Sequence, residues 1–178
     1  NDLTDTNTVQ SETGKIETAR RFVVANSEYF TKTSNDSLSI ASINISYTFT
    51  SWIQIAANTG LKTIVMKRSG TSTGSGLEYG LRVDSATPTL YWGLGGGFDS
   101  LSTGTTLSIN TWYFIVFGYD ADTDKFFYSI NGAAKTYSGS TVTTQVVAGT
   151  NPFQIGATSN GAENHDGLID EVGFWKRL

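Results

Sequence analysis

The most regular pattern in the chain is an alternation of apolar and polar positions between Tyr47 and Ile55. The apolar residues and Ser51 occupy every second position, and Trp52 falls on the other set, among threonines and a glutamine. A period of two is typical of a strand with one buried face and one exposed face. The segment therefore predicts a half-buried β-strand that presents Trp52 on an exposed sheet surface.

A second segment, from Thr111 to Gly132, is apolar on both faces. Two runs, WYFIVFGY and FFYSI, flank the acidic segment DADTD. A strand that is apolar on both faces must be covered on both sides or lie deep in a sheet. The acidic segment predicts an exposed hairpin tip, and Asn131-Gly132 tolerates the positive φ angles of a second tight turn. We therefore place this meander at the centre of an antiparallel sheet.

Shorter patterned segments predict further strands along the chain. They are residues 15–24, 29–30, 63–67, 77–83, 90–94, 153–157 and 168–175, and the glycine- and serine-rich segment 69–76 predicts a surface loop. No segment carries a sustained helical period. About a dozen short strands at this spacing are typical of a two-sheet sandwich. We predict one all-β domain spanning residues 1–178, an antiparallel two-sheet sandwich.

Composition supports a packed domain and narrows the classes of function. The 178 residues are 38% hydrophobic and only 16% charged, with a net charge of −4. Basic residues form no run longer than a pair, so we expect no nucleic-acid binding, which needs a concentrated positive surface. No apolar run approaches the roughly 18 residues of a membrane span. The absence of cysteine excludes thiol chemistry and leaves the cellular compartment open.

Three local patterns together resemble the laminin-G-like, concanavalin A-like jelly-roll family. They are YTFTSWIQ at 47–54, the hairpin from Trp112 to Gly132, and DGLIDEVGFW at 166–175. The resemblance extends from about Lys15 onward and implies a jelly-roll β-sandwich. It also implies a non-catalytic carbohydrate-binding or adhesion module, excised from a larger extracellular or cell-surface protein. The expected partners are a glycan or cell-surface molecule and other domains of the parent chain.

The same fold admits a second interpretation. The chain could be a structural or receptor-binding domain of a phage tail or similar assembly, located on the virion and contacting protein neighbours. Saturable binding of a soluble oligosaccharide would favour the carbohydrate module. A defined trimer in solution would favour the assembly domain.

Four residues are candidates for binding a ligand. Sugar rings stack on the faces of Trp and Tyr side chains, and polar groups at the rim orient their hydroxyls. Trp52 lies on the more polar face of its strand, Arg82 lies on the polar face of another, and one of Tyr91 and Trp92 must point outward. The alternative is that each ring packs under a neighbouring loop, since large aromatic residues are mostly buried.

The resemblance also implies one structural calcium ion. By this resemblance Asp170 is a ligand on the closing strand, and Asn26 and Glu28 offer oxygens in the N-terminal turn. Calcium takes six to eight oxygen ligands. Val23 stands where the family usually has an aspartate. The alternative is that Asp170 accepts hydrogen bonds from backbone amides and binds no ion.

The sequence favours no enzyme. Asp170 and Glu171 are adjacent in a predicted strand, so they point to opposite faces and cannot act together across one sugar bond. The single histidine, His165, has no serine elbow near it, and we expect it to be a loop residue. We therefore predict a protein that binds its partner without converting it.

Overall fold

The computed structural model describes residues 2–40, 44–68, 77–94, 97–143, 149–158 and 163–177. For residues 90–94, 97 and 98 only the backbone is described. The predicted surface loop 69–76 therefore lies outside the described residues, as do the side chains of Tyr91 and Trp92.

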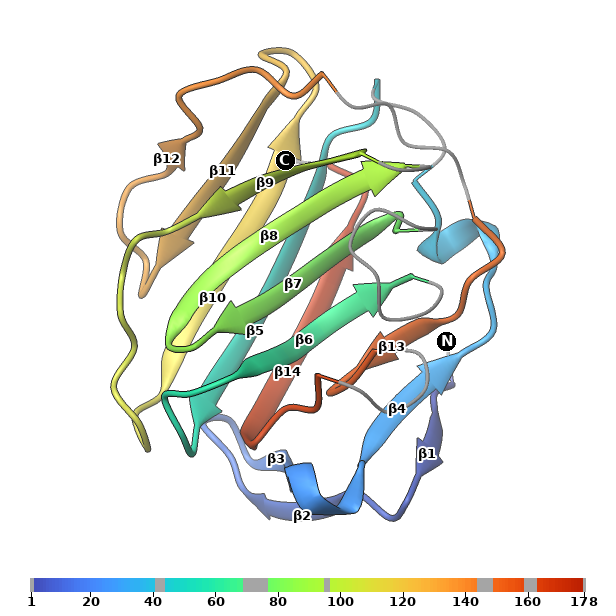
Figure 1. Ribbon diagram of the computed structural model, residues 1–178, viewed down its shortest axis with the longest axis vertical. Helices are drawn as coiled ribbons and strands as arrows, with labels where there is room; N and C mark the ends of the chain where they lie inside the picture. Colours follow the sequence, from blue (N-terminus) through green and yellow to red (C-terminus); the bar gives the residue numbers. More distant parts are fainter. Residues whose placement is uncertain are drawn as a thin grey trace.

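The described chain folds as two stacked seven-stranded sheets with antiparallel pairing (Figure 1). Sheet A has the order β1 (Thr4–Thr6), β4 (Tyr29–Lys32), β13 (Phe153–Ile155), β6 (Leu61–Lys67), β7 (Tyr79–Asp84), β8 (Thr87–Leu94) and β9 (Gly97–Ser102). Sheet B has the order β12 (Thr136–Tyr137), β11 (Lys125–Ile130), β10 (Tyr113–Asp120), β5 (Tyr47–Ile55), β14 (Gly167–Trp175), β3 (Thr18–Phe22) and β2 (Gln10–Thr13). Two 3-10 turns, η1 (Val24–Asn26) and η2 (Asp36–Leu38), complete the elements. The predicted all-β, two-sheet sandwich is confirmed.

Alternate side chains of the two sheets meet in one hydrophobic core. Along β5 every second residue is buried, from Tyr47 to Ile55, as the alternation predicted. Phe49 crosses from sheet B to pack against Tyr79 of sheet A, with ring centroids 5.0 Å apart. Phe49 also stacks on Phe174 at 4.6 Å with an interplanar angle of 14°. Stacked and tilted ring pairs of this kind add to the burial of apolar area that stabilises the sandwich.

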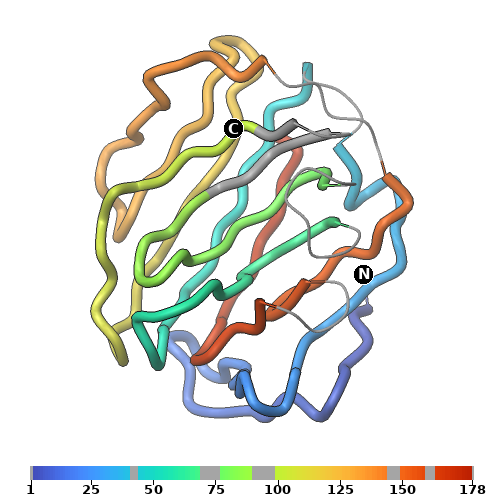
Figure 2. The backbone as a smooth tube through the Cα atoms, viewed as in Figure 1, coloured from blue at the N-terminus to red at the C-terminus, as the bar shows by residue number. Residues whose placement is uncertain are grey.

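Strands that are distant in sequence lie side by side in both layers. β13 fits between β4 and β6, and the C-terminal β14 fits between β5 and β3 (Figure 2). Non-local pairing of this kind is expected when a sandwich is wound from strands that change sheets. It brings the first and last parts of the chain to one edge of the sandwich.

The predicted central meander is present. β10 pairs with β5 on one side and with β11 on the other, and Asn131 and Gly132 both have positive φ, at 53° and 76°. However, the apolar outer face of this segment is not covered by a third layer. Trp112, Phe114 and Val116 remain half-buried on the outside of sheet B.

The first residues of the chain form edge strands of both sheets. β1 pairs with β4 at the edge of sheet A, and β2 pairs with β3 at the edge of sheet B. The N-terminal segment therefore supplies an edge to each sheet. Among the described residues there is no helix long and apolar enough to cross a bilayer.

Candidate ligand-binding site

Two aromatic side chains of neighbouring strands lie together on the outer face of sheet B. Trp52 of β5 is paired directly with Phe114 of β10, so their side chains project from the same face. Their ring centroids are 5.2 Å apart at an angle of 43°, and both side chains are half-buried. The pair thus offers a partly exposed aromatic surface held by a rigid sheet.

These two rings form part of a surface hollow, which we call the aromatic hollow. It is lined by Lys15, Trp52, Trp112, Phe114, Asn131 and Gly132. Its residues come from three separate parts of the chain: the loop between β2 and β3, the strand β5, and the two ends of the β10–β11 hairpin. Only the folded sheet brings them together.

Polar groups at the rim of the aromatic hollow are held in place. Asn131 accepts a hydrogen bond from the backbone N–H of Phe114 through Oδ1 (2.9 Å), and its own N–H donates to the carbonyl of Phe114 (2.8 Å). This arrangement fixes the amide while its NH₂ group remains able to donate to a ligand. The ammonium of Lys15 lies 5.2 Å from the centroid of the Trp52 ring, within the range of a cation–π contact.

The side chains of the aromatic hollow can bind a ligand by stacking and by hydrogen bonding. Flat aromatic faces accept the C–H faces of sugar rings, and an amide and an ammonium at the rim donate hydrogen bonds to hydroxyl oxygens. The six lining residues include no carboxylate or histidine. The aromatic hollow is therefore suited to holding a polar, ring-containing ligand.

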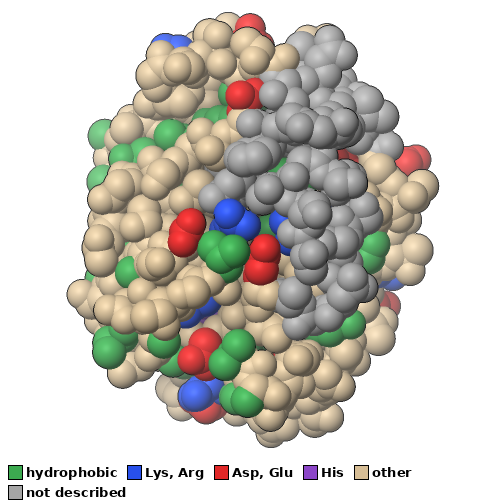
Figure 3. Space-filling model, in the orientation of Figure 1, with side chains coloured by type: hydrophobic (Ala, Val, Ile, Leu, Met, Phe, Trp, Pro, Cys, Tyr) green, Lys and Arg blue, Asp and Glu red, His purple; other side chains and the backbone are tan. Residues whose placement is uncertain are grey.

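The remaining predicted ligand-binding residues lie in the other sheet. Arg82, in β7, is 7% exposed, and its Nη1 lies 3.6 Å from Oε2 of Glu163, which also lies 3.2 Å from Nη2 of Arg68. In β8, the backbone of Tyr91 pairs with that of Gly80, and Trp92 pairs with Tyr79. The structure thus separates Trp52 from the other three residues. The outer side of sheet A, seen in Figure 3, shows basic and acidic side chains next to each other near its centre.

The predicted calcium ligands also fall into two groups. Glu28 is 2% exposed, and its Oε2 accepts a hydrogen bond from the N–H of Val23 (2.7 Å) while Oε1 accepts one from Nδ2 of Asn26 (3.0 Å). Asp170 accepts a hydrogen bond from the N–H of Ile16 through Oδ2 (2.9 Å). Both carboxylates therefore bond to backbone amides, the alternative that the sequence left open for Asp170.

Strand register shows how far apart the two groups are. Ile169 pairs with Arg20, which places Asp170 beside Ala19 on β3. Val23, which Glu28 contacts, is four residues further along, or about 13 Å at the usual rise of a strand. The register of the strands therefore places Asp170 apart from Asn26 and Glu28. No group of three acidic, histidine or cysteine side chains with metal-binding geometry occurs in the described ranges. The calcium ion itself stays a prediction.

Two other residues considered for chemistry are placed as follows. His165 lies outside the strands, as expected of a loop residue, but it is wholly buried, with Nε2 3.3 Å from the carbonyl oxygen of Gln54. Burial lowers its pKa to about 4. Glu171 is exposed at a bulge of β14, whereas Asp170 is buried. The two neighbouring carboxyl groups therefore occupy different environments.

Sequence reasoning identified Trp52 and missed its partners in the hollow. Trp112 and Phe114 were visible as one apolar face of a strand, but only a central place in an antiparallel sheet was predicted for that strand. Asn131 was visible only as a turn residue, and neither it nor Lys15 carried a signal of ligand binding in the sequence. The alignment of β10 beside β5 is a long-range relationship, and it is what turns these residues into one surface.

Comparison with known proteins now identifies the family. A laminin G family model, described as the concanavalin A-like lectin/glucanases superfamily, matches residues 26–178. The chain belongs to this superfamily, as the resemblance implied. Among curated proteins, no sequence matches the chain.

Solved structures with the same fold include binding domains of clostridial toxins. The binding domain of Paraclostridial Mosquitocidal Protein 1 matches with a TM-score of 0.75 at 15% identity, over 99% of this chain and 44% of that chain. A botulinum neurotoxin type C structure, described as needing two ganglioside molecules to enter cells, matches at 0.65 and 11% identity, over 99% and 43%. The binding domain of botulinum neurotoxin DC in complex with rat synaptotagmin II matches at 0.63 and 10% identity, over 99% and 43%.

These likenesses establish the fold of the chain. Identities of 10 to 15% are too low to transfer a ligand. The chain spans less than half the length of each of these three structures. The family model therefore establishes the superfamily, and the solved structures establish the fold.

Proposed function

We propose that this domain binds carbohydrate through the aromatic hollow on the outer face of sheet B. The observation that carries the proposal is the pairing of Trp52 with Phe114, two half-buried rings 5.2 Å apart on a rigid sheet. Water leaves both a ring face and a sugar C–H face when they stack, which favours association. A flexible loop that carried the same residues would lose more conformational entropy when the ligand bound.

The surroundings of the two rings support a sugar over a purely apolar ligand. Lys15 and Asn131 place donors beside the aromatic surface, and Trp112 extends that surface toward the start of β10. A sugar needs both an apolar contact and hydrogen-bond donors at its rim. Catalysis plays no part in this proposal, since the aromatic hollow holds no acid–base pair.

The comparisons support the broader setting of the proposal. One structural neighbour is described as depending on ganglioside molecules, which carry sugars, and all three are toxin structures. By analogy, we place this domain outside the cell or at a cell surface, as a module of a longer protein. Its partner would then be a glycan of a cell surface.

A protein partner is the second candidate. One neighbour is described in complex with synaptotagmin II, a protein, so the same fold also holds protein ligands. An assembly domain, such as that of a phage tail, belongs to this alternative. It predicts a stable oligomer or a protein complex where the first proposal predicts saturable sugar binding.

A glycan array with the isolated domain tests the choice. We expect binding to a defined subset of glycans, and loss of that binding in the Trp52→Ala variant. Tyr137→Ala serves as the matched control, because Tyr137 is an exposed aromatic residue on β12, outside the hollow. An array without signal, or an equal signal from the Trp52→Ala variant, would overturn the proposal.

A further inference from the structure

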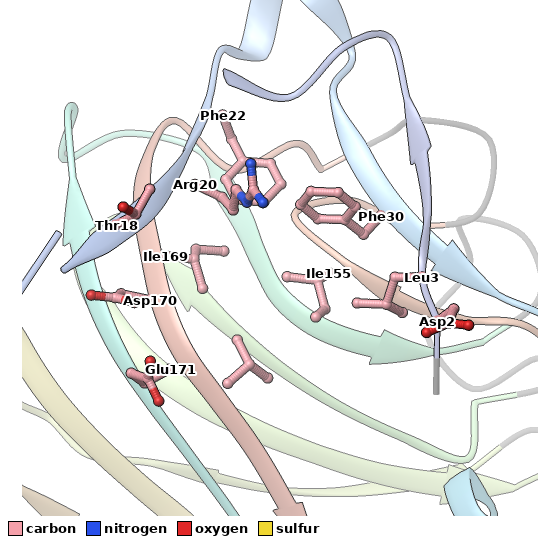
Figure 4. A pocket seen from close by; sticks show the side chains of 11 residues that line it. Asp2, Leu3, Thr18, Arg20, Phe22, Phe30, Ile155, Ile169, Asp170 and Glu171 are labelled. Atoms are coloured by element: carbon pink, nitrogen blue, oxygen red, sulfur yellow. The ribbon is translucent and has the colours of Figure 1, made fainter. Parts of the chain in front are cut away.

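A second cavity opens between the two sheets at the edge where the N-terminal strands lie (Figure 4). We call it the edge cleft. It has a volume of about 460 Å³ and is lined by Asp2, Leu3, Thr18, Arg20, Phe22, Phe30, Ile155, Ile169, Asp170, Glu171 and Val172. Cavities of roughly 300–1,000 Å³ are the size that holds small organic ligands. The edge cleft is separate from the aromatic hollow, which lies on the outer face of sheet B.

Six of the eleven residues that line the edge cleft are apolar, and one arginine projects into the cleft. Arg20 pairs with Ile169, whose side chain is in the core, so register places Arg20 on the inner face of β3. Its guanidinium carbon lies 5.9 Å from the ring centroid of Phe30, which belongs to the opposite sheet. Figure 4 shows Arg20 beside Phe22 and facing Phe30, across the cavity from Leu3. Arg20 is exposed to solvent, so a permanent positive charge lies in the cleft where a ligand can reach it.

The charge of Arg20 has no carboxylate partner in the described part of the chain. Its Nη1 donates to the hydroxyl of Ser11, a neutral group on β2. The next residue, Arg21, points to the other face of β3 and pairs with Glu12 at 3.3 Å. One arginine of the strand is thus ion-paired on the outside, whereas its neighbour lines the cleft without an ion pair to a described residue.

Other charged groups line the ends of the cleft. Figure 4 places Asp2 and Glu171 at opposite ends, with Arg20 between them. The side chain of Asp170 points away from Ile169, to the other side of β14, where it accepts a hydrogen bond from Ile16. The part of the cleft next to Phe22 and Phe30 is therefore its positive part.

From this arrangement we propose that the edge cleft binds a small amphipathic carboxylic acid. Its apolar body would lie along the apolar wall, and its carboxylate would meet the guanidinium of Arg20. Arginine presents a planar fork of donors that fits a carboxylate, and the charged hydrogen bonds so formed are stronger than neutral ones. Burial of the apolar body supplies the remaining affinity, in proportion to its area.

Titration calorimetry with sodium decanoate below its micellar concentration tests the proposal. We expect saturable binding to the unmodified domain, and affinity lowered about tenfold or more in the Arg20→Met variant, the loss expected of a charged hydrogen bond. Arg21→Met, which removes a charge from the outer face of the same strand, should bind as the unmodified domain does. Arg20→Lys, which keeps the charge but not the fork, should fall between the two.

Two further ligands separate the role of the acid from that of the apolar chain. Decanol should bind the unmodified domain more weakly than decanoate, and both should bind the Arg20→Met variant equally. Stronger binding of decylamine than of decanoate would overturn the proposal, because Asp2 and Glu171 would then dominate. Absence of decanoate binding, or equal affinity of the Arg20→Met variant and the unmodified domain, would also overturn it. Chemical shifts of the backbone amides of β3 and β4 should move with decanoate, which locates the site independently of the variants.

Discussion

Nζ of Lys67 lies 2.6 Å from Oε2 of Glu78, and both side chains are almost fully shielded from solvent, at 0% and 1% exposure. The ammonium also donates to the carbonyl of Gly149 (2.7 Å), and the carboxylate accepts the N–H groups of Ile40 and Gly149. The ion pair therefore connects the segments around Ile40 and Gly149 to the neighbouring ends of β6 and β7.

Removing one partner of this pair should destabilise the domain strongly. A buried charge left without its partner costs about 3–5 kcal/mol, so Lys67→Met and Glu78→Gln should each lower the free energy of unfolding by that amount. The double variant should lose less than the sum of the two single losses, because neither charge is then stranded. Urea unfolding measures all three.

The exposed pair of Arg21 and Glu12 provides the control for that experiment. Its side chains are 35% and 47% exposed, and such pairs contribute about 0–1 kcal/mol. Arg21→Met should therefore change the free energy of unfolding little. A loss in Lys67→Met no larger than in Arg21→Met would contradict the role given to the buried pair.

Gly118 should not tolerate a side chain. A Cβ built there would lie 2.3 Å from the backbone oxygen of Tyr47 and 2.4 Å from the ring of Phe127. The oxygen of Tyr47 belongs to the backbone of the paired strand β5 and cannot move aside. Gly118→Ala should therefore lower the free energy of unfolding by about 1–3 kcal/mol, as overpacking does. Gly139→Ala is the control, since no atom lies within 4 Å of that position. Thermal melts of the two variants should differ clearly, and equal melting temperatures would refute the packing described around Phe127.

His165 should make the domain sensitive to mild acid. Burial, the largest cause, lowers its pKa to about 4, while the carbonyl of Gln54 opposes the shift and Lys62 and Arg21 reinforce it. The unfolded chain has an ordinary histidine pKa near 6.5, so it takes up a proton first. The stabilising effect is therefore complete above pH 6.5 and is lost as the pH falls toward 4, by about 3 kcal/mol.

The His165→Asn variant separates this effect from the titration of carboxylates. Its free energy of unfolding should fall less between pH 7 and pH 4 than that of the unmodified domain, although it starts lower. If the free energy of unfolding fell equally with pH in the two proteins, His165 would not be kept neutral in the folded domain.

Calcium is tested by melting the domain with a chelator and with added calcium. If the predicted ion is bound, added calcium should raise the melting temperature and the chelator should lower it, because an ion that binds only the folded domain stabilises it. An unchanged melting temperature in both experiments would contradict the prediction. A rise with calcium that disappears in Asp170→Asn would show an ion at β14. Glu28→Gln would then report whether the N-terminal turn takes part.

Local pattern in the sequence predicted the strands well, because the period of side chains along a strand is a local property. The alternation of β5 correctly placed Phe49 in the core and Trp52 on the outside. The Asn131-Gly132 turn was also predictable, since few residues accept its positive φ angles.

The assembly of the sites was not predictable in the same way. Trp52 and Arg82 have similar local patterns, yet one lies in sheet B and the other in sheet A. Arg20 occupies an inward position that a period of two would assign to an apolar residue. Which strands become neighbours depends on pairing between distant segments, and neither cavity exists before that pairing is complete.

Whether the aromatic hollow holds a sugar is decided by calorimetric titration of the domain with the strongest glycan from the array. We expect saturable binding by the unmodified domain, and affinity reduced about tenfold or more in Trp52→Ala, as for a central aromatic contact. Tyr137→Ala should retain the original affinity. Unchanged affinity in Trp52→Ala, with the fold intact, would contradict the claim.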